Sequence, residues 1–243
     1  MVALGIDIGG SGIKGAPVDL ERGVLLEERF RLATPKPATP SAVAESVATL
    51  VEHFEWTGRV GCTFPGIVRQ GVVASAANVD HAWIGTDGVT LFEQATGCQV
   101  SLVNDADAAG VAEVRLGAAA GQPGVVLVLT FGTGIGSGLF VDGVLVPNTE
   151  LGHLQLDEHR DAEVWAAAAA RDRDNLSWSE WGRRVDRYLH QVQALFSPDL
   201  IVLGGGASKR FDSYRNELTV ATEVVPAALL NQAGIVGAAL LAG

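Results

Sequence analysis

The sequence predicts an α/β protein in which helices cover the faces of sheets. Apolar strand-like runs alternate with amphipathic segments, and this alternation occurs twice along the chain in a similar order. Each half contains an apolar run, a glycine-rich turn and a second strand-like run, at residues 7–14 and 129–138. The repeated order predicts two α/β domains built on a similar plan.

The first half begins with strand-like runs at residues 2–8, 11–18 and 24–32, and prolines then interrupt the pattern. A helix is expected from residue 41 to about 55, with Ser41 as its N-cap, because an apolar stripe follows at helical spacing. The remaining elements expected here are strands at 59–63, within 67–75 and at 98–103, a loop at 76–89 and a helix at 106–116.

The second half contains a continuous apolar run at 125–129, which predicts a buried strand, and strands are expected near 136–147. Residues 151–156 are expected to be extended. Helices are expected at 161–171, 178–196 and 227–242, and a strand at 200–203.

Composition and charge exclude several classes of protein. The 243 residues are 48% hydrophobic and 19% charged, which is typical of a globular chain, and the net charge of −11 disfavours nucleic-acid binding. Cys62 and Cys98 are too few for a disulfide framework or a cysteine zinc site and indicate a reducing compartment. The sequence shows neither a signal peptide nor a membrane span, so a cytoplasmic protein is expected.

Basic residues are concentrated in residues 171–215, which hold eight of the seventeen lysines and arginines together with six acids. This pattern has two interpretations. The segment is either a solvated helical surface with alternating charges or an arginine strip that guides a polyanion toward the site.

The two glycine-rich turns predict a phosphate-binding site. Glycines let a ligand approach the backbone amides closely, and two such turns facing each other across a cleft would hold a chain of phosphates. Phosphoryl transfer is therefore the first hypothesis, although the chain has no P-loop match. The candidate residues are Asp7, Gly9, Gly10, Ser11, Gly12 and Lys14 in the first turn and Thr130, Gly132, Thr133 and Gly134 in the second.

Asp7 and Lys14 each have two interpretations. A carboxylate beside phosphates would repel them unless a divalent cation lies between, and Mg²⁺ needs only one or two carboxylates, waters and phosphate oxygens. Asp7 could instead cap the hairpin by accepting from the turn amides. Lys14 either pairs with phosphate charge or is a surface lysine.

Asn104 and Asp105 end a predicted buried strand and open a helix, a position where α/β proteins bind ligands. Asp105 could accept a proton from an attacking hydroxyl, or it could cap the helix. Glu150 and His153 could hydrogen-bond neighbouring sugar hydroxyls, and Asn78 and Glu163 are further polar candidates. His153, Asp157 and His159 match no strong zinc signature. Gly204, Gly205 and Gly206 follow an apolar strand, as in a nucleotide-binding turn.

Taken together, these motifs resemble the ROK sugar-kinase family of the actin–hexokinase superfamily. Residues 7–14 and 129–138 resemble its two phosphate motifs, residues 103–105 its catalytic strand end, residues 150–153 its sugar-binding E-x-G-H and residues 203–207 its adenosine motif. The resemblance implies a two-domain actin-like ATPase (ribonuclease H-like) fold with a cleft between the domains. The expected domains are residues 1–103 and 104–226, with the helix at 227–243 packing back on the first.

The resemblance also implies the roles of the site residues. Asp105 would be the general base, and Asp7 would hold Mg²⁺ through water. The glycine-rich turns would hold the donor phosphates, and Gly204, Gly205 and Gly206 the nucleotide. Sugar hydroxyls would be bound by Gly66, Asn78, Asn104, Asp105, Glu150, His153 and Glu163.

The sequence departs from the family pattern after the E-x-G-H motif. Family members usually carry a zinc cluster of several cysteines there, whereas residues 154–170 contain none, so no structural zinc is expected. A short chain with residues 155–163 in this place resembles the polyphosphate glucokinase and glucomannokinase branch, some members of which also use ATP or accept mannose.

The expected activity is transfer of a phosphoryl group from inorganic polyphosphate, and from ATP, to the 6-hydroxyl of glucose, with mannose as a further candidate acceptor. One alternative is an ATP-only ROK kinase for another hexose. Another is a non-catalytic sugar-sensing ROK protein, against which the start of the chain at the first strand and the presence of Asp7 and Asp105 argue. The apolar face of the 178–196 helix leaves a homodimer open.

Overall fold

The computed structural model describes residues 1–76, 79–156 and 159–243. The chain forms two compact units, one of Met1–Ala112 with Gln232–Gly243 and one of Glu113–Asn231. Each unit has one main sheet, so the α/β prediction is confirmed. The expected division at residues 103 and 104 differs from this one, because the first residues of helix α3 (Asp105–Leu116) pack against helix α7 (Ala233–Ala242) in the first unit.

The main sheet of the first unit has the strand order β3-β2-β1-β5-β8, with β4 also paired to β2. Strands β1, β5 and β8 run parallel, whereas β2 runs antiparallel to β1. The expected run at 24–32 is two short strands rather than one. The bounds are β1 Val2–Ile8, β2 Ile13–Asp19, β3 Val24–Leu25, β4 Phe30–Leu32, β5 Val60–Phe64 and β8 Val100–Asn104, with a separate hairpin of β6 Val68–Arg69 and β7 Val72–Val73.

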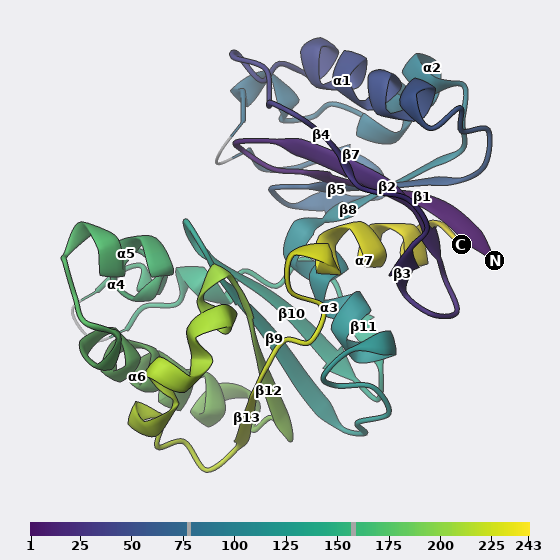
Figure 1. Ribbon diagram of the computed structural model, residues 1–243. Helices are drawn as coiled ribbons and strands as arrows, with labels where there is room; N and C mark the ends of the chain where they lie inside the picture. The colour runs from purple at the N-terminus through teal and green to yellow at the C-terminus, as the bar shows by residue number, and fades with distance from the viewer. Residues whose placement is uncertain (77–78, 157–158) are drawn as a thin grey trace. The chain divides into compact units, whose positions relative to one another are not determined.

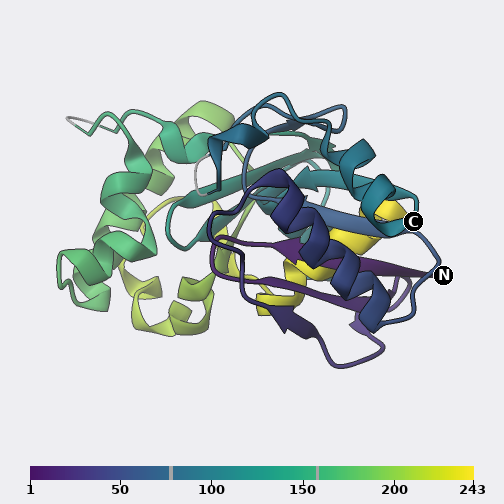
Figure 2. The ribbon, with the colours of Figure 1, turned by 90° about the horizontal axis from the view of Figure 1, so that it is seen from above.

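Helices α1 (Pro40–His53) and α2 (Gly88–Thr96) lie on one face of this sheet, and α7 lies on the other (Figure 1). Figure 2 looks down on α1 where it lies over β1 and β2. The N-cap of α1 is Thr39 rather than Ser41, because the Thr39 hydroxyl accepts the Ala42 N–H and proline occupies the first helical position. The expected loop at 76–89 was wrong in part, since it contains the short helix η1 (His81–Trp83) and the start of α2.

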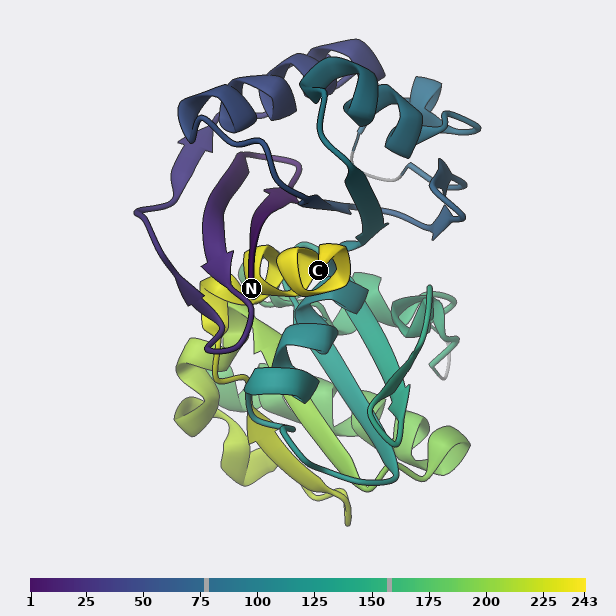
Figure 3. The same cartoon turned by 90° about the vertical axis from the view of Figure 1, so that its right-hand side faces the viewer.

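Helix α7 packs with its backbone directly on the sheet (Figures 1 and 3). Gly5 of β1 and Gly61 of β5 are neighbours in register, and a Cβ at either would meet a backbone carbonyl of α7, that of Ile235 or Ala238. On its other side, Gly237 of α7 lies against the Ala108 carbonyl of α3. The helix is therefore buried on both sides, which explains why it is apolar all round. It begins at Ala233, six residues later than expected.

The sheet of the second unit has the order β11-β10-β9-β12-β13, with β9, β12 and β13 parallel. The expected helix at 178–196 is confirmed as α6, which a capping box of Ser177 and Glu180 begins. Strand β13 was not expected, and the expected helix at 161–171 is two short helices. The bounds are β9 Val125–Phe131, β10 Ile135–Val141, β11 Val144–Val146, β12 Leu200–Gly205, β13 Glu223–Pro226, α4 Ala162–Ala166, α5 Ala168–Arg173 and α6 Trp178–Phe196.

The core of the second unit lies between its sheet and α6. The buried face of α6 comprises Trp181, Val185, Tyr188, Leu189 and Val192, which pack with residues of β9 and β12. Across the residues that the structure describes, no helix combines the length and apolar character needed to cross a bilayer.

The contact of α7 with Gly61 predicts a large effect of one methyl group. Gly61→Ala places Cβ on the Ala238 carbonyl, where backbone must move, and should lower the free energy of unfolding by about 2 kcal/mol. Urea unfolding followed by circular dichroism measures this. Glu45→Ala, on the exposed face of α1, is the control and should change stability by less than about 0.5 kcal/mol. Equal stability of Gly61→Ala and the parent would contradict the packing.

Candidate active site

In the first unit, three segments predicted to form the site follow the carboxyl ends of parallel strands. The first glycine turn follows β1, the segment with Gly66 follows β5, and Asp105 follows β8. The register places Ile6 beside Cys62 and Phe64 beside Asn104, so the three strands end at the same edge of the sheet. Ligands of α/β proteins bind at such edges.

The Asp7 carboxylate is held by two side chains from neighbouring strands. The Thr63 hydroxyl of β5 donates to Asp7 Oδ1 at 2.9 Å and accepts the Ile8 N–H at 3.0 Å. Lys14 Nζ lies 2.9 Å from Asp7 Oδ2, and the two side chains are 25% and 19% exposed, so Lys14 is not a surface lysine. The turn itself closes through the Gly9 N–H and the Gly12 carbonyl, 3.0 Å apart.

Thr63 was not singled out from the sequence, although it carries a detectable signal. It is a fully buried polar residue in the otherwise apolar strand β5. Buried hydroxyls are hydrogen-bonded in native structures, so a polar residue within such a run indicates a fixed polar partner nearby.

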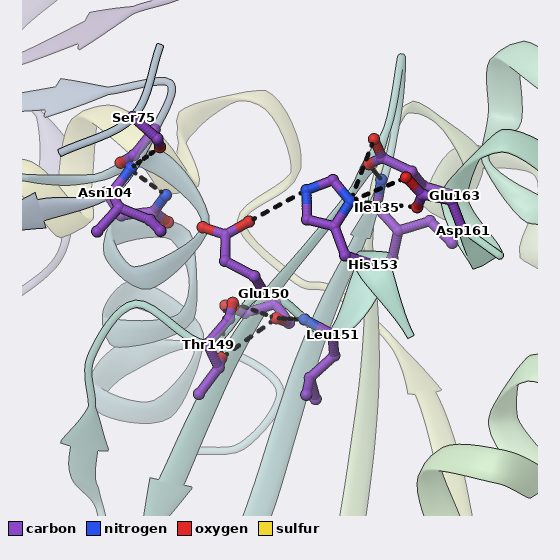
Figure 4. A network of polar contacts seen from close by, with 12 residues as sticks. Ser75, Asn104, Ile135, Thr149, Glu150, Leu151, His153, Asp161 and Glu163 are labelled. Atoms are coloured by element: carbon purple, nitrogen blue, oxygen red, sulfur yellow. Dashed lines mark hydrogen bonds and ion pairs between the residues drawn. The ribbon is translucent and has the colours of Figure 1, made fainter. Parts of the chain in front are cut away.

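At the end of β8, Asn104 caps the following helix. Asn104 Oδ1 accepts the N–H groups of Ala106 and Asp107 at 2.8 and 3.0 Å, and its amide donates to the Gly66 carbonyl at 3.1 Å (Figure 4). Asn104 therefore supplies the cap that Asp105 was considered for. The Asp105 side chain is exposed at the first residue of α3, and its Oδ1 also accepts the Ala106 N–H. Asn78 lies outside the described residues.

In the second unit, two predicted donor-binding turns lie at one sheet edge. Strand β12 is parallel to β9, with Gly204 beside Thr130 and Gly205 beside Phe131. Gly132, Thr133 and Gly134 form the turn after β9, so it lies next to residues 204–206. Gly205 has a φ of 76°, and a Cβ there would meet the Phe131 backbone, so only glycine fits at this position.

The segment that carries Glu150 and His153 is hydrogen-bonded to and packed on the β9–β10 hairpin, which contains the second glycine turn. The buried Ser137 hydroxyl of β10 donates to the Thr149 carbonyl at 2.5 Å and accepts the Leu151 N–H at 3.0 Å. Gly152 packs against the Ile135 carbonyl. Residues Leu151–His153 form the short helix η2, so the expectation of extended structure at 151–156 was wrong in its first half, whereas Leu154 is extended and Leu156 forms an isolated bridge with His159.

Carboxylates surround the His153 imidazole (Figure 4). Asp161, which was not expected at the site, contacts Nδ1 with both oxygens, at 3.1 and 3.2 Å. Glu163 Oε1 lies 3.9 Å from Nδ1, while its Oε2 accepts the Ile135 N–H at 3.1 Å and lies against Gly134. Glu150 Oε2 lies 3.9 Å from Nε2. The structure thus brings the sugar-site candidates Glu150, His153 and Glu163 together with the second glycine turn.

This clustering shifts the pKa values of two groups. Burial raises the pKa of Glu150, the His153 charge lowers it, and Glu163 raises it, and the net shift is upward. Burial lowers the pKa of His153, but the hydrogen bond and charge of Asp161 and the charges of Glu163 and Glu150 outweigh it, and the pKa is raised. One oxygen or nitrogen atom from each of His153, Asp161 and Glu163 lies within 4.8 Å of the other two. Such a set of donor atoms is of a kind that binds metals. The hydrogen bond between Asp161 and His153 accounts for part of this grouping.

The basic residues of 171–215 are largely paired with acids. Five arginines lie 2.6–3.3 Å from a carboxylate oxygen, which favours the solvated-surface interpretation for them. Lys209 and Arg210 differ in their placement, because they are exposed on η3 (Gly206–Ser213), directly after the third glycine-rich segment. The five pairs are Arg171–Asp172, Arg173–Asp174, Arg183–Glu217, Arg184–Asp174 and Arg215–Asp212.

Two α/β units of this kind, each with a glycine turn between antiparallel strands at its sheet edge, define the actin-like ATPase fold of the sugar kinases. The profile of the ROK family matches residues 3–164. The chain therefore belongs to the ROK family, and the resemblance seen in its motifs is confirmed.

Individual relatives show which members of the ROK family this chain is similar to. Polyphosphate glucokinase from Mycobacterium tuberculosis is 49% identical over 237 residues, covering 97% of this chain and 89% of that protein. The inorganic polyphosphate/ATP-glucomannokinase from Arthrobacter sp. strain KM superimposes with a TM-score of 0.94 at 55% identity, covering 99% and 97% of the two chains. A ROK glucokinase from Streptomyces griseus, solved with glucose and AMPPNP, has a TM-score of 0.86 at 26% identity and covers 100% and 99%.

The raised pKa of Glu150 predicts a stabilising substitution. The folded protein holds the Glu150 proton more tightly than the unfolded chain does, so ionisation destabilises the fold as pH rises through the ordinary value and beyond. Glu150→Gln should raise the free energy of unfolding at pH 7, and the gain should vanish below about pH 4. Urea unfolding across this pH range measures it.

Glu180→Gln is the matched control with the opposite sign. Hydrogen bonds from Ser177 lower the pKa of Glu180, so its ionised form stabilises the fold, and the variant should be less stable at pH 7. A loss of stability at pH 7 in Glu150→Gln as well would contradict the unfavourable environment of Glu150.

Proposed function

We propose that the chain is a cytoplasmic hexose kinase, a phosphotransferase that moves a phosphoryl group from inorganic polyphosphate, and from ATP, to the 6-hydroxyl of glucose. The observation that carries this proposal is that Asp7 with its glycine turn and Asp105 lie at one edge of the same sheet, where the parallel strands β1 and β8 end on either side of β5, in a chain 49% identical to a polyphosphate glucokinase. The name of the Arthrobacter relative supports ATP as a second donor and mannose as a second acceptor.

In this proposal, Asp105 is the general base. Its exposed carboxylate at the start of α3 accepts the proton of the 6-hydroxyl as that oxygen attacks the terminal phosphorus. The bond from phosphorus to the bridging oxygen breaks, and shortened polyphosphate or ADP leaves. Because Asn104 caps the helix, the next residue, Asp105, has a defined position at the helix N-terminus.

The proposed sugar-binding groups are polar groups of the candidate site. Glu150 accepts from hydroxyls, His153 accepts or donates through Nε2, and the Asn104 amide and the Gly66 backbone also bind hydroxyls. Glu163 and Asn78 complete the proposed set. Neutral sugars are recognised by such hydrogen-bonding groups, whose pairing a wrong isomer leaves unmade.

Donor phosphates are bound by backbone amides of the two glycine turns, at Gly9, Gly10, Ser11 and Gly12 and at Thr130, Gly132, Thr133 and Gly134, with Lys14 nearby. Residues 204–206 lie beside the second turn and would receive the nucleoside part of ATP. Amides directed at a developing negative charge stabilise it without rearrangement of solvent.

Asp7 fits a magnesium ion held through water. Its carboxylate is fixed by Thr63 and Lys14 yet remains partly exposed, and Mg²⁺ usually keeps several waters. When bound, Mg²⁺ would neutralise part of the charge on the donor phosphates.

The assay that tests the proposal combines the protein and Mg²⁺ with glucose, mannose, fructose or N-acetylmannosamine and either polyphosphate or ATP, and measures sugar 6-phosphate. Glucose 6-phosphate formed from polyphosphate supports the proposal. Transfer from ATP alone to another hexose would identify an ATP-only ROK kinase, and sugar binding without transfer would identify a sugar-sensing protein. Light scattering after gel filtration distinguishes a monomer from the homodimer.

Asp105→Asn tests the general base. The substitution keeps the shape of the side chain and removes its basicity, so kcat should fall at least about a hundredfold while glucose affinity changes little. Steady-state kinetics and calorimetric glucose binding measure the two effects. Asp172→Asn, at a carboxylate 78% exposed, is the control. Near-normal turnover of Asp105→Asn would remove Asp105 from the mechanism.

Lys209 and Arg210 test how a long donor is attracted. The double variant Lys209→Gln, Arg210→Gln should raise KM for long polyphosphate several-fold and KM for ATP less, because a longer polyanion interacts with more charges. Arg183→Gln is the matched control, since Arg183 is already paired with Glu217. A similar rise for both donors would show that these cations do not extend the donor site.

A further inference from the structure

The side chain of Asp161 does not cap a helix, although its position favours capping. Asp161 is the N-cap residue of α4, where aspartate normally accepts a backbone N–H of the first turn, yet it makes no such hydrogen bond. Its two oxygens lie instead 3.1 and 3.2 Å from His153 Nδ1, eight residues earlier in the chain (Figure 4).

We propose that Asp161 is a positioning residue that fixes the tautomer and orientation of the His153 imidazole, so that Nε2 is the atom presented to the sugar. This inference rests on the proposed function and names a residue that acts through His153 rather than on the substrate.

The chemistry of the pair dictates the tautomer. An ionised carboxylate can only accept, so the proton of the neutral imidazole must be on Nδ1, and Nε2 carries the lone pair. Nε2 is the ring atom on the side of Glu150, 3.9 Å from Oε2. A sugar hydroxyl at this place would donate to Nε2, and a neighbouring hydroxyl would donate to Glu150. With the other tautomer, Nε2 would donate and could no longer accept.

The neighbouring acid on α4 does not supply this contact. Glu163 Oε1 is 3.9 Å from Nδ1, beyond hydrogen-bond distance, and its other oxygen is engaged by the Ile135 N–H. Among the residues that the structure describes, the acids in contact with the ring are Asp161 and Glu163 on the Nδ1 side and Glu150 on the Nε2 side. Of these three, Asp161 alone makes a hydrogen bond to the ring.

Asp161→Ser separates positioning from helix capping. Serine is as good an N-cap residue as aspartate, but its shorter side chain cannot span the distance to the imidazole. Asp161→Asn retains a carbonyl oxygen that accepts from Nδ1–H and serves as the conservative variant. Asp172→Ser is the control at an exposed carboxylate of α5.

Two measurements test the inference. Nitrogen-15 NMR of histidine-labelled protein, in buffer with a chelator, without sugar and at a pH above the raised pKa of His153 so that the ring is neutral, reports which ring nitrogen carries the proton, and His153→Gln assigns the signal among the five histidines. The parent and Asp161→Asn should show the Nδ1–H form, and Asp161→Ser should lose it. The glucose KM of Asp161→Ser should rise about tenfold, as for one lost hydrogen bond, with the KM for polyphosphate unchanged.

An Nδ1–H signal in Asp161→Ser equal to that of the parent would overturn the inference, and so would a changed tautomer with an unchanged glucose KM. Failure of the proposed function is distinguishable from both. In that case the parent forms no sugar phosphate, while the NMR spectra still show whether Asp161 sets the tautomer.

Discussion

In both units, parallel strands precede several of the candidate site residues, and this pairing decides where those residues lie. Strands β1, β5 and β8 end together, so Asp7, Gly66 and Asp105 reach one sheet edge from positions up to about a hundred residues apart in the chain. Strands β9 and β12 do the same for the second glycine turn and residues 204–206. A slip of one register position would turn each of these side chains to the opposite face.

Buried polar side chains then hold the functional groups in place. Thr63 fixes the Asp7 carboxylate, Ser137 fixes the segment that carries Glu150, and Asn104 begins the helix that carries Asp105. Each of these three side chains is more than nine-tenths buried on or at the end of a strand, where an unmade hydrogen bond would be costly. The functional groups themselves are more exposed, and the carboxylates around His153 repel one another, so the scaffold tolerates an electrostatic penalty at the site.

Several elements were predictable because they depend on local properties of the chain. Strong periodicity or continuous apolar character marks the first strand, the apolar run of β9 and the 178–196 helix. Both glycine turns are recognisable from their local runs of glycine. The errors occurred where packing overrides local preference. Helix α2 was missed because it is short and is stabilised by the Asp87 cap and by burial of Phe92. Residues 151–153 form a short helix instead of extended structure, and the Ser137 hydroxyl accepts the Leu151 N–H at its start.

The sequence by itself determined the fold class, the family motifs and the residue types able to bind phosphates and sugar hydroxyls, because these follow from short patterns of side chains. Only the tertiary structure decided which of them meet. Thr63 beside Asp7 and Asp161 beside His153 come from different elements, and α7 closes the first sheet from the far end of the chain through Gly5 and Gly61. Contacts of this kind depend on strand register and on the direction of single side chains, which no local pattern encodes.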